Sequence, residues 1–186
     1  MVLPDHEISR RDMIRPFAEG GRRPGIISYG LTSYGYDIRT GEDFYIFNNA
    51  RHGVVDPKRF DSRHVSLATI ESQDESRFVV LPPHGFALCE SLEVVTVPRD
   101  LHVLCVGKST YARCGLIVNV TPLEPEWSGT ITLELSNTTP LPLRVYVNEG
   151  IAQLVFLKAS DLCRVSYADK RGKYQNQHAV TFARVD

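Results

Sequence analysis

Short runs of β-branched and aromatic residues follow one another through most of this chain, and Gly, Pro, Asn or Asp separates each run from the next. Such runs between turn residues are typical of an all-β sandwich or barrel. After residue 20, no stretch of about ten residues repeats its apolar positions with the 3.6-residue period of a helix, which disfavours an α/β fold. The runs predict strands over residues 34–39, 43–47, 64–70, 77–81, 86–97, 101–106, 116–120, 130–135, 143–147 and 151–157, with a turn at Gly41 and Glu42.

The N-terminal region predicts one short helix, over residues 5–14. Asp5 is the expected N-terminal cap and Pro16 the expected stop. The Gly- and Arg-rich link over residues 19–25 should be exposed and mobile. A chain of 186 residues has the size of one domain, and we expect residues 1–186 to fold as a single unit.

Composition limits the partners that such a chain can have. Its 21 basic and 22 acidic side chains give a net charge of −1, whereas nucleic-acid-binding domains usually carry a strongly basic footprint. A nucleotide fits this balance, because it needs only a few local cations. The four cysteines form no C-x-x-C pair, and no apolar run approaches the ~20 residues of a membrane span. We expect a soluble, cytoplasmic protein with free thiols that binds neither nucleic acid nor membrane.

One carboxylate interrupts an otherwise apolar strand. In the run from Ile131 to Ser136, a period of two places Leu133 on one face, and Thr132 and Glu134 on the other. If that second face lines a cleft, Glu134 is partly desolvated, so its pKa rises and it can accept and return a proton near pH 7. A solvent-facing Glu on a half-exposed strand fits the same pattern, and the residues alone leave both interpretations open.

A basic turn precedes this strand, from Gly107 to Arg113, with the sequence GKSTYAR. Arg113 can bind phosphate or carboxylate oxygens through two parallel N–H groups, and Lys108 supplies a point charge near Ser109. Backbone N–H groups of the turn can add further anion contacts. The chain lacks G-x-x-x-x-G-K-[ST], so this turn is not a Walker P-loop. An anion-binding turn and a solvated basic turn both remain open.

The C-terminal stretch over residues 167–177 is polar and basic and contains Gly172, and a short apolar run over residues 179–185 follows it. A segment tethered on both sides can act as a lid over a charged ligand, or it can be a solvated loop.

Zinc is not expected. The H-x-E and P-C-x-x-C motifs of zinc nucleobase deaminases are missing, and the six histidines do not pair at ligand spacing.

A set of motifs, taken in order, resembles the dCTP deaminase family, which is related to the trimeric dUTP pyrophosphatases. The motifs are YGYD at 34–37, GKSTYARCG at 107–115, WSG at 127–129, LE at 133–134, GIAQ at 150–153 and GKYQNQ at 172–177. The resemblance implies a mainly β, distorted barrel or jelly roll of the dUTPase-like type, with residues 160–178 as a C-terminal lid. It also implies hydrolytic deamination of dCTP to dUTP and ammonia, which feeds dUMP and dTTP synthesis.

The same resemblance implies roles for particular residues. Glu134 would activate water for attack on cytosine C4 and then carry the proton to the leaving amine, while Ser109 and Arg113 help to organise the catalytic site. Mg²⁺ would arrive bound to the triphosphate rather than perform the chemistry. Homotrimers with sites shared between subunits, and inhibition by dTTP, are further expectations. The implied nucleotide contacts are Lys108, Ser109, Thr110, Tyr111, Ala112, Arg113, Thr132, Leu133, Glu134, Gln153, Tyr167, Lys173 and Gln177.

Two alternatives use the same fold. One is an enzyme that cleaves dUTP, either a dUTP pyrophosphatase or a bifunctional dCTP deaminase and dUTP pyrophosphatase that releases dUMP. The other is a non-catalytic nucleotide sensor for which Glu134 is dispensable. The loop over residues 121–127 is also shorter than in some relatives, and Glu126 is a candidate to replace an aspartate that those relatives carry there.

Overall fold

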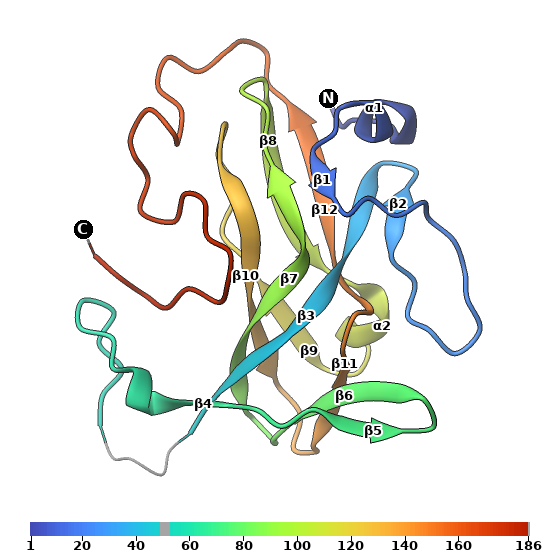
Figure 1. Cartoon of the computed structure of the whole chain (residues 1–186), viewed down its shortest axis with the longest axis vertical. Coiled ribbons are helices and arrows are strands. Elements are labelled where there is room, and N and C mark those ends of the chain that lie inside the picture. Colours follow the sequence, from blue (N-terminus) through green and yellow to red (C-terminus); the bar gives the residue numbers. More distant parts are fainter. Residues whose placement is uncertain (49–52, 186) are drawn as a thin grey trace.

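The computed structural model describes residues 1–48 and 53–185, and its architecture is a twisted antiparallel sheet that curls into a barrel (Figure 1). The main path of strands runs β8-β12-β3-β7-β10-β9, and the two end strands, β8 and β9, contact each other. A smaller sheet, β11-β6-β5, packs at one end. The elements are α1 (Asp5–Arg10), β1 (Ile14–Arg15), β2 (Gly30–Thr32), β3 (Gly35–Phe47), a 3₁₀ turn η1 (Ser62–His64), β4 (Val65–Leu67), β5 (Glu71–Gln73), β6 (Ser76–Leu81), β7 (Phe86–Thr96), β8 (Leu101–Gly107), α2 (Ser109–Ala112), β9 (Leu116–Asn119), β10 (Ser128–Asn137), β11 (Leu143–Tyr146) and β12 (Gly150–Lys158).

The all-β prediction with a short N-terminal helix is confirmed, and the alternation read from the sequence explains where the core lies. On β10, Ile131, Leu133 and Leu135 are almost fully buried inside the barrel, whereas Thr132 and Glu134 are only partly buried on the other face. A one-residue slip of this strand would exchange the two sets, so burial of the apolar face fixes the register against β7 and β9.

The predicted turn at Gly41 and Glu42 is wrong. Residues 35–47 form one continuous strand, β3, and the pairing with β7 shifts register between Thr40 and Phe44. An irregularity of this kind bends a strand without ending it. Gly41 fits the bend, because a Cβ there would lie 2.7 Å from the Glu90 side chain. The strand can therefore serve both halves of the barrel.

The N-terminal helix is shorter than predicted. It ends at Arg10 rather than residue 14, because Asp12 takes a left-handed φ of 49° and Ile14 then begins β1 against β7. Pro4 is the N-cap residue, and the Asp5 carboxylate instead accepts a hydrogen bond from the next residue, His6. The link over residues 19–25 is exposed, as predicted. Among the described residues, no helix is long and apolar enough to span a membrane.

The C-terminal segment after β12 runs back along the outside of β10 (Figure 1). Asn176 N donates to Ser128 O at 2.8 Å, and Thr130 N donates to Gln177 O at 2.9 Å. Gly129 permits this close approach. Its φ is +147°, and a Cβ at this position would lie 2.6 Å from Gln177 O. The segment is thus held against the strand that carries Glu134.

Candidate active site

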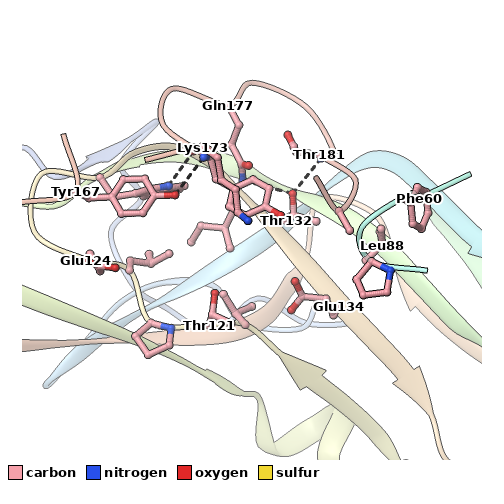
Figure 2. A pocket seen from close by; sticks show the side chains of 18 of the residues that line it. Phe60, Leu88, Thr121, Glu124, Thr132, Glu134, Tyr167, Lys173, Gln177 and Thr181 are labelled. Carbon is pink, nitrogen blue, oxygen red and sulfur yellow. Dashed lines mark hydrogen bonds between the residues drawn. The ribbon is translucent and has the colours of Figure 1, made fainter. Parts of the chain in front are cut away.

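A cavity of about 900 Å³ lies between β10 and the C-terminal segment. Its size suits a small-molecule ligand, since such sites usually span ~300–1,000 Å³ and are mainly apolar with a few polar groups. Figure 2 shows Glu134 and Thr121 on one side of this cavity, with Lys173 and Gln177 of the C-terminal segment across from them. Its apolar wall includes Phe47, Phe60, Phe86, Leu88, Val120, Pro122, Leu123, Trp127 and Ile131.

Glu134 is the carboxylate that the strand presents to the cavity. It pairs with Leu88 on β7 and with Asn119 on β9, so two neighbouring strands fix its backbone. Its Oε2 is buried without a hydrogen-bond partner among the described residues. Burial raises the pKa of Glu134 to about 7, because the apolar wall disfavours the charged form. A carboxylate with this pKa can both take up and release a proton at neutral pH.

Thr132 lies on the same face as Glu134 and ties the strand to the C-terminal segment. Its Oγ1 accepts hydrogen bonds from Gln177 Nε2 at 3.3 Å and from Thr181 N at 3.2 Å. Leu133, between them, points into the barrel core and is fully buried. Its side chain therefore does not reach a ligand on the Glu134 face.

Four residues of the predicted lid line the cavity, namely Tyr174 and the three predicted nucleotide contacts Tyr167, Lys173 and Gln177. Gln177 Nε2 also donates to Thr130 O at 2.7 Å, and the Tyr167 hydroxyl accepts a hydrogen bond from Tyr174 N at 3.1 Å. These contacts hold the segment over the cavity. The Lys173 ammonium lies 5.5 Å from the centroid of the Tyr174 ring and is a cation available to an anionic group in the cavity.

The basic turn lies elsewhere. It forms the short helix α2, on the side of the barrel opposite the C-terminal segment (Figure 1), and Lys108, Ser109, Thr110, Tyr111, Ala112 and Arg113 do not line the cavity. Ser109, Thr110, Ala112 and Arg113 are exposed. Tyr111 is buried, and its hydroxyl accepts a hydrogen bond from Tyr146 N at 2.8 Å. Within one subunit, the structure does not bring the basic turn to Glu134.

Lys108 and Gln153 converge on a residue that sequence reasoning did not single out as functional, Asp37. The Lys108 ammonium forms a buried ion pair with Asp37 Oδ2, and Gln153 Nε2 donates to Asp37 Oδ1 at 3.0 Å. Gln153 also reaches Thr32 Oγ1 at 3.4 Å. Asp37 thereby anchors the N-terminal end of α2 to the barrel. A charged residue within an otherwise buried strand was the available signal.

The loop before β10 is held by the barrel on one side and forms cavity wall on the other. Leu123 exchanges two backbone hydrogen bonds with Val103, and Glu124 and Pro125 line the cavity. Glu126 does not line it, because its Oε2 accepts a hydrogen bond from Arg99 Nη1 at 2.8 Å. Within this subunit, the Glu126 carboxylate is therefore directed away from the position that a substrate would occupy.

Aromatic residues from distant segments build one wall of the cavity, and sequence reasoning missed them. Phe182, near the C-terminus, stacks on Phe60 with ring centroids 5.1 Å apart, and it meets Tyr45 in a T-shaped contact with ring centroids 5.2 Å apart. Phe47 packs against Phe60 and Phe86. Isolated aromatic residues far apart in the chain carry no periodic signal, so only the fold could reveal this cluster.

Within the described ranges, no group of three or more His, Cys, Asp and Glu side chains is placed to hold a metal ion. The cysteines do not pair either: Cys89 and Cys105 are buried free thiols, Cys114 is exposed and Cys163 is partly buried. Besides Glu134, Thr132 and the C-terminal residues, the polar side chains that line the cavity include His102, Thr121 and Glu124.

Comparison with known proteins identifies the family. Residues 3–159 match the family model described as dCTP deaminase-like. The chain is 52% identical over 179 residues to a dCTP deaminase of Acidobacterium capsulatum, covering 96% of this chain and 94% of that protein. It is 57% identical over 176 residues to a dCTP deaminase of Nautilia profundicola, covering 94% and 91%.

A solved structure shares the fold. The 2'-deoxycytidine 5'-triphosphate deaminase from Agrobacterium tumefaciens superposes with a TM-score of 0.58 at 18% identity, over 83% of this chain and 48% of that chain. The family match spans most of the sequence and includes the strand that carries Glu134. On the strength of that match and of the close relatives, this chain belongs to the dCTP deaminase-like family.

Proposed function

We propose that this protein hydrolyses dCTP to dUTP and ammonia, with Glu134 as general base and then general acid. The single observation that carries the proposal is the half-buried Glu134 carboxylate in a cavity large enough for a nucleotide, with its Oε2 left without a hydrogen-bond partner by the part of the chain that the structure describes. Family membership, and close relatives named dCTP deaminase, support the choice of substrate.

The reaction adds water to C4 of cytosine and expels the amino group. Glu134 removes one proton from the water as its oxygen bonds to C4. It then delivers that proton to the exocyclic nitrogen, so that the C4–N4 bond breaks and ammonia leaves. The second proton of the water moves from the C4 hydroxyl to N3, which gives the C4 carbonyl and the N3–H of uracil. A pKa of about 7 suits this double role, because neither protonation state is strongly favoured at neutral pH. No catalytic zinc is required in this scheme.

The substrate would lie with its base beside β10 and its phosphates toward the C-terminal segment. Thr132 and the backbone of Leu133 lie next to Glu134 along β10 and would contact the base, and the Lys173 ammonium would neutralise phosphate charge. Tyr167 and Gln177 complete the covering wall. Mg²⁺ would enter as part of the Mg·dCTP substrate, bound to phosphate oxygens. We propose dTTP as an inhibitor that occupies the same cavity.

A homotrimer would complete the site. The exposed α2 turn carries the Arg113 cation and the Ser109 hydroxyl but lies away from the cavity of its own subunit. Two apolar side chains beside it, Val106 and Ile117, are 43% and 56% exposed, as expected for a surface that another subunit covers. We propose that residues 108–113 of one subunit face the cavity of the next, where Ser109 and Arg113 order the phosphates. Gln153 supports this turn through Asp37.

Product analysis tests the proposal. The purified protein is incubated with dCTP and Mg²⁺, and dUTP, dUMP, pyrophosphate and ammonia are separated and quantified. dUTP and ammonia in equal amounts, without pyrophosphate, are the expected result. dUMP with pyrophosphate would instead establish the bifunctional alternative. Absence of ammonia under conditions in which dCTP binds would contradict the deaminase assignment and favour a nucleotide sensor.

A further inference from the structure

Arg99 lies outside the cavity, in the turn between β7 and β8, yet it contacts both segments that form the cavity's outer wall. Its Nη1 donates to Glu126 Oε2 at 2.8 Å, in the loop before β10. Its Nη2 donates to Asp169 Oδ2 at 2.8 Å, in the C-terminal segment. One guanidinium group therefore bridges two segments that the sequence separates by more than forty residues.

The C-terminal segment meets this guanidinium with backbone as well as side chain. Arg99 Nη2 also donates to Arg164 O at 3.1 Å and to Cys163 O at 3.3 Å. The same Asp169 Oδ2 accepts a hydrogen bond from Ser166 N at 2.9 Å, and Ser166 Oγ accepts one from Asp169 N. Ser166 is fully buried. Arg99 is thus part of a closed network around residues 163–169, not an isolated surface ion pair.

The turn that carries Arg99 gives this network a firm base. Val97 and Leu101, on either side, are buried core residues. Glu126 N donates to Val97 O at 2.9 Å, and Val97 N donates to Trp127 O at 2.9 Å. Arg99 thereby fixes the C-terminal segment relative to the barrel core. A second ion pair, Lys170 Nζ to Glu124 Oε2 at 2.7 Å, joins the same two segments on the outside.

We propose that Arg99 is a positioning residue, which fixes the base of the C-terminal segment so that Tyr167, Lys173 and Gln177 cover the bound substrate. The inference rests on the proposed deaminase activity, because it assigns those three residues to substrate binding. The pKa of Asp169 lies below its usual value, through the hydrogen bonds from Ser166 and Arg99, so the network stays charged at neutral pH.

The test compares Arg99→Met with the wild type and with a matched control, Arg11→Met. Arg11 forms a part-buried ion pair with Asp100, the residue next to Arg99. Because Arg11 is the C-cap residue of α1, this ion pair joins the same turn to α1 and not to the C-terminal segment. With Arg99→Met, the KM for dCTP should rise roughly tenfold, since hydrogen bonds to charged groups and a small ion-pair network are removed. The kcat should change by less than about twofold, as expected when only binding is weakened.

Hydrogen exchange supplies a readout that does not depend on activity. Backbone amides of residues 163–177 should exchange faster in Arg99→Met than in the wild type, whereas Arg11→Met should leave them unchanged. Arg99→Lys should give an intermediate result, because one ammonium group cannot reproduce the two-sided guanidinium contact. Asp169→Asn tests the same contact from the exposed side and serves if Arg99→Met does not fold. The double variant Arg99→Met/Asp169→Asn should be no worse than Arg99→Met alone.

Unchanged KM and unchanged exchange of residues 163–177 in both Arg99→Met and Asp169→Asn would overturn the proposal. A wild-type protein that releases no ammonia would contradict the proposed function instead. In that case the exchange data alone decide whether Arg99 holds the segment.

Discussion

Burial of the Glu134 carboxyl lowers the free energy of unfolding of the protein at neutral pH. An unfolded chain ionises this carboxyl near 4.5, whereas the folded protein holds its pKa at about 7 through burial. Below pH 4.5 both states are protonated and burial of the group has no electrostatic cost. As pH rises from 4.5 to 7, the unfolded state loses its proton first, so the folded state loses relative stability, and the loss is complete above pH 7.

Replacing Glu134 with Gln should therefore stabilise the protein, but only at neutral and alkaline pH. We expect the variant to gain roughly 1–2 kcal/mol at pH 8, after allowance for the partial exposure of the group, and almost nothing at pH 4. Thermal or urea unfolding of both proteins at the two pH values measures this difference. Equal stabilities at pH 8 would show that Glu134 ionises normally, which would weaken its role as a base.

The C-terminal segment and β10 act together at the scale of elements. The segment has too few apolar residues to be stable alone, and backbone hydrogen bonds to Ser128 and Thr130 hold it in place. That close approach depends on Gly129, where any side chain would meet the backbone of Gln177. A short stretch of β10 thus serves two purposes, since it carries the catalytic candidate and also docks the segment that covers it.

Gly129→Ala should consequently open the cavity without disturbing the barrel. The added Cβ would lie 2.6 Å from Gln177 O, and the positive φ adds backbone strain. We expect the KM for dCTP to rise at least about tenfold and amides of residues 170–178 to exchange faster, while amides of the barrel strands stay protected. The matched control is Gly21→Ala, because a Cβ at Gly21 would meet no atom within 4 Å. Similar kinetics for the two variants would contradict this account.

The sequence predicted those elements that a local pattern of apolar residues determines. It did not predict those that depend on contacts between residues far apart in the chain. The long strands and the face of Glu134 followed from alternation, since burial of Leu133 and Leu135 fixes the orientation of the strand. The three-residue strands β2 and β5 were missed, because hydrogen bonds to neighbouring strands, rather than an apolar pattern, create them. The Phe60–Phe182 contact and the bridges of Arg99 join residues far apart in sequence, so no local signal could indicate them.

At the scale of the whole molecule, the two halves of the predicted site lie on different sides of one subunit. The cavity contains Glu134, Thr132 and the C-terminal residues, while Ser109 and Arg113 are exposed on α2. The resemblance placed all of them in one site, and a single chain does not assemble it. The proposed homotrimer would reconcile the two observations, because each α2 could then face the cavity of a neighbouring copy.

Mixed trimers test this arrangement. Homotrimers of Glu134→Gln and of Arg113→Ala should each be inactive or nearly so, for different reasons. When the two variants are co-expressed, some interfaces join one subunit of each kind. At such an interface the Arg113→Ala subunit can supply an intact Glu134 cavity, and the Glu134→Gln subunit can supply an intact α2. Random assembly places this combination at about one interface in four, so about a quarter of wild-type activity should return. A mixture no more active than its separate components would show that each site is built within one chain.

The central claim is that Glu134 moves protons in the deamination of dCTP, and Glu134→Gln tests it most directly. The measurement is the initial rate of ammonia release at saturating Mg·dCTP, with the dissociation constant for dCTP determined in parallel. As a control, Glu71→Gln changes an exposed carboxylate on β5 and should behave as the wild type. We predict at least about a 10²-fold loss of rate for Glu134→Gln with dCTP binding nearly unchanged, since removal of a general acid–base group acts on the chemical step. Near-normal ammonia release from Glu134→Gln would contradict the account.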